Sequence, residues 1–259
     1  MGATFIDVDK NVRLKVKERL ARINAEGIAY HELNMLIKKL LNRGFGKIEI
    51  FNVCGQRYLG IGLKDKAEFK VYGIPGNNLG AFMEGPEILV YGNVQDGCGN
   101  TMSDGLIAVH GCAGDVLGYS MRGGKIFVRG DVGYRAGIHM KGLHSNPTLV
   151  IGRYAGAFLG EYMAGGIILL LGLSLGETRS KLRFVGTGMH GGVIYLRGTT
   201  AHVGKGAKII EVDESDMSVI RGLTREFCNC FNLNYDELIC GNFSKIVPLS
   251  QRPYEKLYS

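Results

Sequence analysis

The chain lacks an apolar run long enough to cross a bilayer. Its most apolar stretch, residues 165–176, is shorter than the roughly 20 residues of a membrane helix, and Arg153 and Glu161 flank it. The start, MGATFIDVDKNVR, has no apolar signal core. Six cysteines without the spacing of a disulfide framework indicate reduced thiols. We therefore expect a cytoplasmic protein without membrane contact.

The sequence also lacks the patterns of common catalytic and metal sites. The cysteines form no CxxC pair and are interpreted as small buried side chains; they are Cys54, Cys98, Cys112, Cys228, Cys230 and Cys240. No spacing predicts a Ser/His/Asp triad or a carboxylate pair. We therefore predict no catalytic, cofactor-binding or metal-binding residue in this chain.

Glycine is abundant, with 40 in 259 residues, against about 7% on average. Six glycines close similar segments, and the first three are nineteen residues apart. Another glycine lies twelve residues before each closing glycine, and a methionine lies nine residues before it. In the fourth segment this holds once three extra residues around 144–146 are allowed. The set is Gly80, Met83, Gly92, Gly99, Met102, Gly111, Gly118, Met121, Gly130, Gly137, Met140, Gly152, Gly160, Met163, Gly172, Gly186, Met189 and Gly198. Such a period predicts one unit stacked on itself.

Each segment ends in a short strand, as in EILVYG, KIFVRG and VIYLRG. Residues four and two before the closing glycine are assigned to the inside, and residues three and one before it are assigned to the outside. A nineteen-residue unit suits one coil of a right-handed parallel β-helix, whose corners need the positive φ of glycine. We predict a mainly β protein with about seven coils of 19–22 residues, in which methionine fills the core beside a corner.

Three regions are expected. Residues 1–59 form a small α/β cap, residues 60–212 form the β-helix, and residues 213–259 form a helical and then extended tail. The tail is expected to cover the side or the far end of the solenoid. In the N-terminal region, residues 31–43 predict a helix, and KIEIFNV and RYLGIGL predict strands.

A further helix is predicted near the start, because Val12, Val16, Leu20 and Ile23 fall on one helical face and Gly27 follows as a stop. Residues 1–47 hold ten Lys/Arg against five Asp/Glu, and the whole chain carries a net charge of +7. The basic residues are spread around the expected helical faces. This spread favours a solvated surface over a nucleic-acid interface.

The fourth and fifth segments carry an unusually apolar outer face. Counting from the closing glycines places Leu149, Ile151, Leu169 and Leu171 outside. An apolar stripe of this kind must be covered. The cover is either the C-terminal helix of this chain or a partner, which includes a second copy in a homo-oligomer.

Residues 186–191 match the GxGxxG pattern of dinucleotide-binding folds. That fingerprint requires a strand before it and a helix after it. Here the strand VIYLRG follows, and the glycines lie on the repeat's own register. The pattern therefore predicts a coil corner.

The run GEYMAGGIILLLG, residues 160–172, resembles an EYM-x-GG segment of the C-terminal GXGXG domain of the glutamate synthase large subunit. Residues 99–101 and 188–192 resemble two other coils of that domain. The tail FSKIVP, with Tyr254 after it, is similar to its ending. The coil DVLGYSMRGGKIFVRG is equally similar to the GXGXG β-helix subunit of formylmethanofuran dehydrogenase, but the tail favours glutamate synthase.

Glutamate synthase makes glutamate from glutamine and 2-oxoglutarate. It uses an N-terminal-cysteine amidotransferase domain and a central domain that holds flavin and an iron–sulfur cluster. This chain begins Met1-Gly2 and has no cluster spacing. The resemblance therefore implies a non-catalytic scaffold subunit that binds no cofactor and has amidotransferase and flavin/iron–sulfur synthase subunits as partners. The alternatives are a scaffold like the one in formylmethanofuran dehydrogenase, or an independent enzyme or ligand-binding β-helix.

Overall fold

The computed structural model describes residues 5–64, 66–142, 145–173, 182–198 and 201–250. Among the predicted features, His144, Tyr254 and the rest of the tail beyond residue 250 lie outside the described residues. Among the helices described, none has both the length and the apolar character needed to cross a bilayer.

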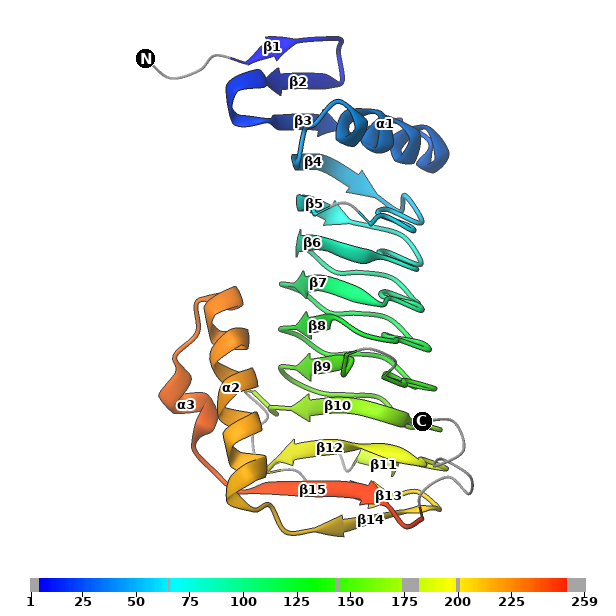
Figure 1. The fold of residues 1–259 in the computed structure, drawn as a ribbon, viewed down its shortest axis with the longest axis vertical. Helices are drawn as coiled ribbons and strands as arrows, with labels where there is room; N and C mark the ends of the chain where they lie inside the picture. Colours follow the sequence, from blue (N-terminus) through cyan, green and yellow to red (C-terminus); the bar gives the residue numbers. More distant parts are fainter. Residues whose placement is uncertain (1–4, 65, 143–144, 174–181, 199–200, 251–259) are drawn as a thin grey trace.

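A thirteen-stranded sheet runs along the whole molecule (Figure 1). Its strands, in spatial order, are β1 (Ile6–Asp7), β2 (Val12–Lys15), β3 (Leu20–Asn24), β4 (Lys47–Cys54), β5 (Glu68–Ile74), β6 (Glu84–Tyr91), β7 (Asp104–Val109), β8 (Lys125–Val128), β9 (Thr148–Ile151), β10 (Ala164–Leu170), β12 (Gly191–Arg197), β15 (Phe243–Pro248) and β14 (Ala207–Ile210). Two further strands, β11 (Leu182–Val185) and β13 (Ala201–Val203), form a separate parallel pair.

Neighbouring strands from β3 to β12 are parallel, one from each coil. The ends of the sheet are antiparallel, with β1 and β2 before β3 and with β15 and β14 after β12. The predicted mainly β, parallel solenoid of about seven turns is confirmed. Because the parallel ladder already begins at β3, strands before residue 60 continue the stack.

The solenoid core consists of columns of like residues. Ile107 lies beside Ile126 and Val109 beside Val128 in the register of β7 and β8, and all four side chains are buried. The methionines form a second buried column. A Cβ added at Gly124 would come 2.7 Å from Cε of Met102, so the methionine of one coil fits only against a glycine of the next.

The corner glycines are required by both conformation and space. Gly99 has a φ of +70°, and Gly118 and Gly137 have similar angles. A side chain on Gly99 would also collide with Ile126 in the next coil. The residue before each methionine has positive φ too, although it is not glycine in five coils: Phe82, Thr101, Ser120, His139 and Tyr162.

The predicted first helix is wrong. Val12 lies in β2, Ile23 lies in β3, and a short 3-10 turn, η1 (Val16–Glu18), joins the two antiparallel strands. The helical spacing of the four apolar residues is interrupted by the turn, in which Val16 is exposed. Burial of Ala21, Ile23 and Ala25, on alternate residues, shows that the period is two.

The second predicted helix is confirmed as α1 (Tyr30–Asn42), whose buried Leu33, Ile37 and Leu40 join the solenoid core. KIEIFNV is confirmed as β4. RYLGIGL is not a strand but the coil corner between β4 and β5, since Tyr58, Gly60 and Gly62 have positive φ. Leu63 there aligns with the column methionines.

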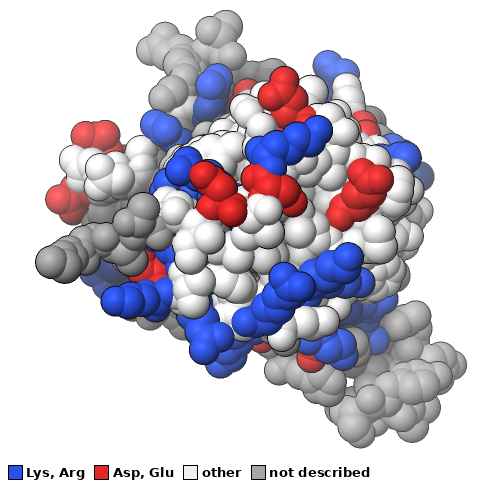
Figure 2. Space-filling model, turned by 90° about the horizontal axis from the view of Figure 1, so that it is seen from above, with Lys and Arg blue, Asp and Glu red and all other residues white. Residues whose placement is uncertain are grey.

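Charges of both signs lie on the β1 end of the molecule (Figure 2). Three ion pairs join cations of the first strands to acids: Arg13–Asp7 at 2.7 Å, Arg22–Glu49 at 2.6 Å and Lys15–Glu18 at 3.3 Å. Surface ion pairs contribute little to stability, so these pairs indicate a solvated surface with a surplus of cations.

Candidate functional site

The residues predicted to form the apolar outer stripe are divided between the two faces of the sheet. Leu169 and Leu171 lie on the outer face. Leu149 and Ile151 lie inside the solenoid core, where Leu149 is in register with Ile126 and Ile151 with Val128. The outward assignment of Leu149 and Ile151 is therefore wrong.

The error comes from the glycine used to set the register. Gly152 directly follows Ile151, and its N–H donates to Val128 O, as Arg129 N–H donates to Val109 O one coil earlier. Gly152 thus occupies an outward strand position, one residue before the usual closing position. The insertion in this coil consequently has four residues rather than three. A one-residue slip turns every side chain of a strand to the other face.

The observed outer stripe is continuous across β7–β12, and the chain covers it with its own helices. Its buried members are Ala108, Phe127, Val150, Leu169, Leu171 and Tyr195. Helix α2 (Glu214–Phe231) packs on it with α3 (Tyr235–Ile239) beyond, along the half of the sheet away from β1 (Figure 1). Phe227, fully buried, meets the ring of Phe127 edge-on at 6.0 Å. The stripe was expected to be covered either by the C-terminal helix of this chain or by a partner, and the structure shows that the chain's own helix covers it.

A buried polar cluster fixes the start of α2. Asp213 and Asp216 form a reciprocal capping box, which satisfies backbone N–H groups at the helix start. The Asp216 carboxylate also accepts hydrogen bonds from Tyr195 Oη at 2.7 Å and from Lys245 Nζ at 2.9 Å. Burial raises the pKa of Tyr195, and the bond to Asp216 acts in the same direction. Burial alone would raise the pKa of Asp216, but the bonds from Lys245 and Tyr195 outweigh it and lower that pKa.

Replacing Asp216 with asparagine is expected to destabilise the protein by about 1–3 kcal/mol at neutral pH, because Lys245 loses its buried partner. A carboxyl whose pKa is lowered by folding stabilises the native state above its unfolded pKa, and this contribution disappears as the pH falls through the folded value. The stability difference between wild type and Asp216→Asn should therefore shrink below about pH 4. Urea unfolding at several pH values measures it. An Asp216→Asn difference that stays constant at all pH values would contradict the assignment.

The outer face of β4–β7 carries a ladder of stacked rings. Phe51, Tyr72, Tyr91 and His110 follow one another with centroids 4.6–4.8 Å apart. Burial lowers the pKa of His110, and Arg129 acts in the same direction. His110 then meets Phe231 edge-on at 5.0 Å, so the ladder ends against α2. Leu89 of β6 still packs against the helix cluster, whereas within the described residues α2 and α3 leave the outer face of β4 and β5 open (Figure 1).

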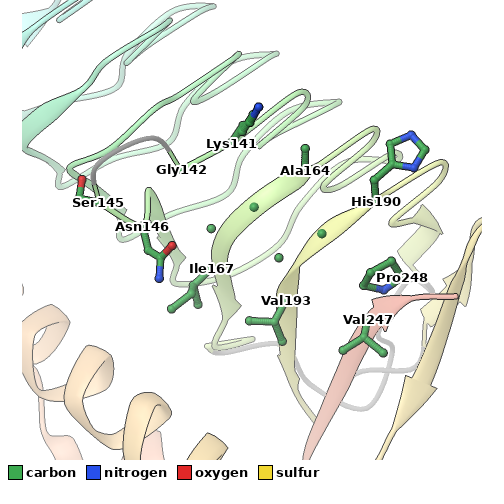
Figure 3. A pocket seen from close by; sticks show the side chains of 14 residues that line it. Lys141, Gly142, Ser145, Asn146, Ala164, Ile167, His190, Val193, Val247 and Pro248 are labelled. Atoms are coloured by element: carbon green, nitrogen blue, oxygen red, sulfur yellow. The ribbon is translucent and has the colours of Figure 1, made fainter. Parts of the chain in front are cut away.

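A hollow of about 850 Å³ lies beside the glycine pairs of the last coils (Figure 3). Gly165, Gly166, Gly191 and Gly192 are among its lining residues, and Lys141 and His190 lie at one rim. A Cβ on Gly166 or Gly192 would come within 2.8 Å of a methionine Cε in the previous coil. Core packing therefore accounts for Gly166 and Gly192, and close approach of the previous coil's backbone accounts for Gly165 and Gly191, without a ligand.

Gly186 and Gly188 have positive φ and precede β12, so the GxGxxG match is the predicted coil corner. The cysteines are distributed along the molecule: Cys98 and Cys228 are buried, Cys112 and Cys230 are half-buried, and Cys54 and Cys240 are exposed. Among the described side chains, no three His, Cys, Asp or Glu residues are grouped so that they could hold a metal ion.

A parallel stack of glycine-cornered coils defines the chain as a β-solenoid protein. The pattern of the GXGXG motif family matches residues 15–251, so the chain belongs to this family. Over 251 residues it is 48% identical to the uncharacterized protein MJ1350 of Methanocaldococcus jannaschii, covering 92% of this chain and 95% of that protein. The membership supports the glutamate synthase-type relationship indicated by the sequence.

Proposed function

We propose that the protein is a non-catalytic scaffold subunit of a glutamate synthase-type complex. In this proposal, separate amidotransferase and flavin/iron–sulfur synthase subunits make glutamate from glutamine and 2-oxoglutarate. The solenoid holds them in register and binds neither cofactor. The observation that carries the proposal is the GXGXG family match over residues 15–251, nearly the whole described fold.

The segments that resemble the glutamate synthase domain are structural parts of the solenoid. In GEYMAGG, Met163 is in the buried column, and buried Glu161 pairs with Arg135 at 2.9 Å. The FSKIVP tail is β15, which lies between β12 and β14 and completes the sheet. The resemblance thus involves residues that build the core and close its end, which fits a shared scaffold.

The shape of the molecule suits a spacer. Strands in a sheet are about 4.8 Å apart, so thirteen strands extend roughly 60 Å. Columns of buried isoleucine and methionine make the stack rigid along this length. A rigid body of this size can keep two catalytic subunits at a fixed separation.

The test is purification of the tagged chain from its native cells at endogenous level, with identification of the proteins recovered. We expect an amidotransferase and a flavin/iron–sulfur synthase subunit, and glutamine-dependent glutamate formation in the eluate. Recovery of molybdenum or tungsten subunits would instead favour a scaffold like the β-helix subunit of formylmethanofuran dehydrogenase. Recovery of the chain alone would refute a subunit role.

A further inference from the structure

The corner of the last five coils, on or beside the turns that carry the column methionines, displays two rows of aromatic rings. The first row is Tyr119, His139 and Tyr162, and the second is Phe158, Phe184 and His202. His139 stacks on Tyr162 at 5.4 Å and Phe158 on Phe184 at 4.9 Å. Although stacked, the rings stay in contact with solvent: Tyr119 is 39% exposed, Tyr162 46% and Phe184 40%. We call these six residues the aromatic corner.

The backbone does not require these rings. Phe158, Tyr162 and Phe184 all have φ between +51° and +67°, a conformation that is strained for bulky residues. Glycine occupies the equivalent place in other coils, as Gly97 does for Phe158 and Gly188 does for Tyr162. Glycine there would remove the strain, so the fold alone gives no reason for large aromatic side chains. A role in recognition at the surface gives such a reason.

The aromatic corner is bordered by an excess of cations. Arg183 and Lys205 are exposed, Arg122 and Lys141 are half-buried, and the structure gives none of the four an ion-pair partner among the described residues. Of the acids on the same turns, Glu161 has an ion-pair partner, and exposed Asp115 has only backbone hydrogen-bond donors. Glu161 pairs with Arg135, which also lies over the Phe158 ring at 4.9 Å. Asp115 accepts a hydrogen bond from Tyr134 N–H.

Aromatic rings and arginine are enriched at protein–protein interfaces. A nucleic acid fits less well, because bases stack on free ring faces in a groove. Here the faces of Phe158 and Phe184 are turned to each other, and the surface is a corner. A second copy is disfavoured by the chain's net charge of +7. The complementary partner is a protein face with acidic side chains around an apolar centre.

We propose that the aromatic corner and its four cations are the docking surface for an acidic face of a partner subunit. This inference rests on the proposed scaffold role and locates one of its contacts. It places the partner across the corner of the last coils, while α2 and α3 cover the outer sheet face.

The test compares tagged variants in the native cells, with nuclease-treated lysate and mass spectrometry of the proteins recovered. Arg183→Glu with Lys205→Glu should lower recovery of the wild-type partner at least about tenfold, because charge reversal sets like charges face to face. The matched control, Lys38→Glu with Lys39→Glu on exposed α1 positions, makes the same change in net charge and should retain the partner.

A ring-removal variant separates docking from folding. Phe184→Gly suits its φ of +59° and lies outside the solenoid core, so the variant should still fold, as circular dichroism would show, and nevertheless lose the partner. Equal partner recovery from wild type and the Arg183/Lys205 variant would overturn the docking surface and leave the scaffold role intact. Corner-dependent recovery of a partner outside glutamate metabolism would support the surface and refute the proposed function. Nuclease-sensitive recovery, or recovery of the chain alone, would overturn the docking proposal.

Discussion

Replacing Met121 with aspartate is expected to prevent folding, whereas Arg129→Gln should melt close to wild type. Met121 is fully buried in the methionine column, and Arg129 is exposed on the outer face. Truncating a buried methionine costs about 2–5 kcal/mol. An unpaired buried carboxyl adds a further desolvation cost of about 2–7 kcal/mol. Together these costs match the whole stability of a typical domain, about 5–15 kcal/mol.

Circular dichroism and thermal unfolding measure this effect. Met121→Leu is the conservative control, because a volume-conserving apolar exchange costs less than about 1.5 kcal/mol. A cooperative transition for Met121→Asp near the wild-type temperature would show that the methionine column is not part of the core.

Replacing Gly99 with alanine should destabilise the protein by about 2–5 kcal/mol. Its φ of +70° is strained for alanine, at about 1–2 kcal/mol. The new methyl group would also lie 3.3 Å from Ile126 Cγ1 and closer to its Cδ1, and overpacking of this kind costs about 1–3 kcal/mol. Ile126 is fully buried, so it has no free space into which to move.

Gly46→Ala is the matched control for Gly99→Ala. Gly46 does not have positive φ, and an added Cβ there meets nothing within 4 Å. That exchange should be neutral or stabilise by up to about 1 kcal/mol through the unfolded state. Denaturant midpoints of the two variants provide the comparison, and equal midpoints would contradict the steric role of the corner glycines.

The repeat was predictable because its requirements are local. Each corner needs glycine, and six successive coils place a methionine at the same buried position, so both recur in the sequence. The register of β9 was not predictable in this way, since Gly152 resembles the other closing glycines and only the pairing of Leu149 with Ile126 reveals the slip. The hairpin at Val12 was missed because apolar residues of two strands and of the turn between them fall on a helical spacing in the sequence.

The surface features were harder to predict, because they depend on which coils become neighbours. That α2 covers the outer stripe follows from the meeting of Phe227 and Phe127, a hundred residues apart in the sequence. A signal for the aromatic corner did exist: His139 and Tyr162 both precede a column methionine. Their backbone conformation, which shows that the rings are not needed for the fold, appears only in three dimensions.

The residue before each column methionine has a similar positive φ in every coil, whatever its side chain. At this position the backbone conformation and the chemistry of the side chain are therefore independent. Phe82, Thr101, Ser120, His139 and Tyr162 have almost the same backbone there, with φ from 51° to 57°. Because the glycine and methionine columns determine that geometry, the side chain can change from ring to hydroxyl to imidazole without disturbing the core. Substitutions along this edge can therefore alter what the molecule recognises while its architecture stays constant.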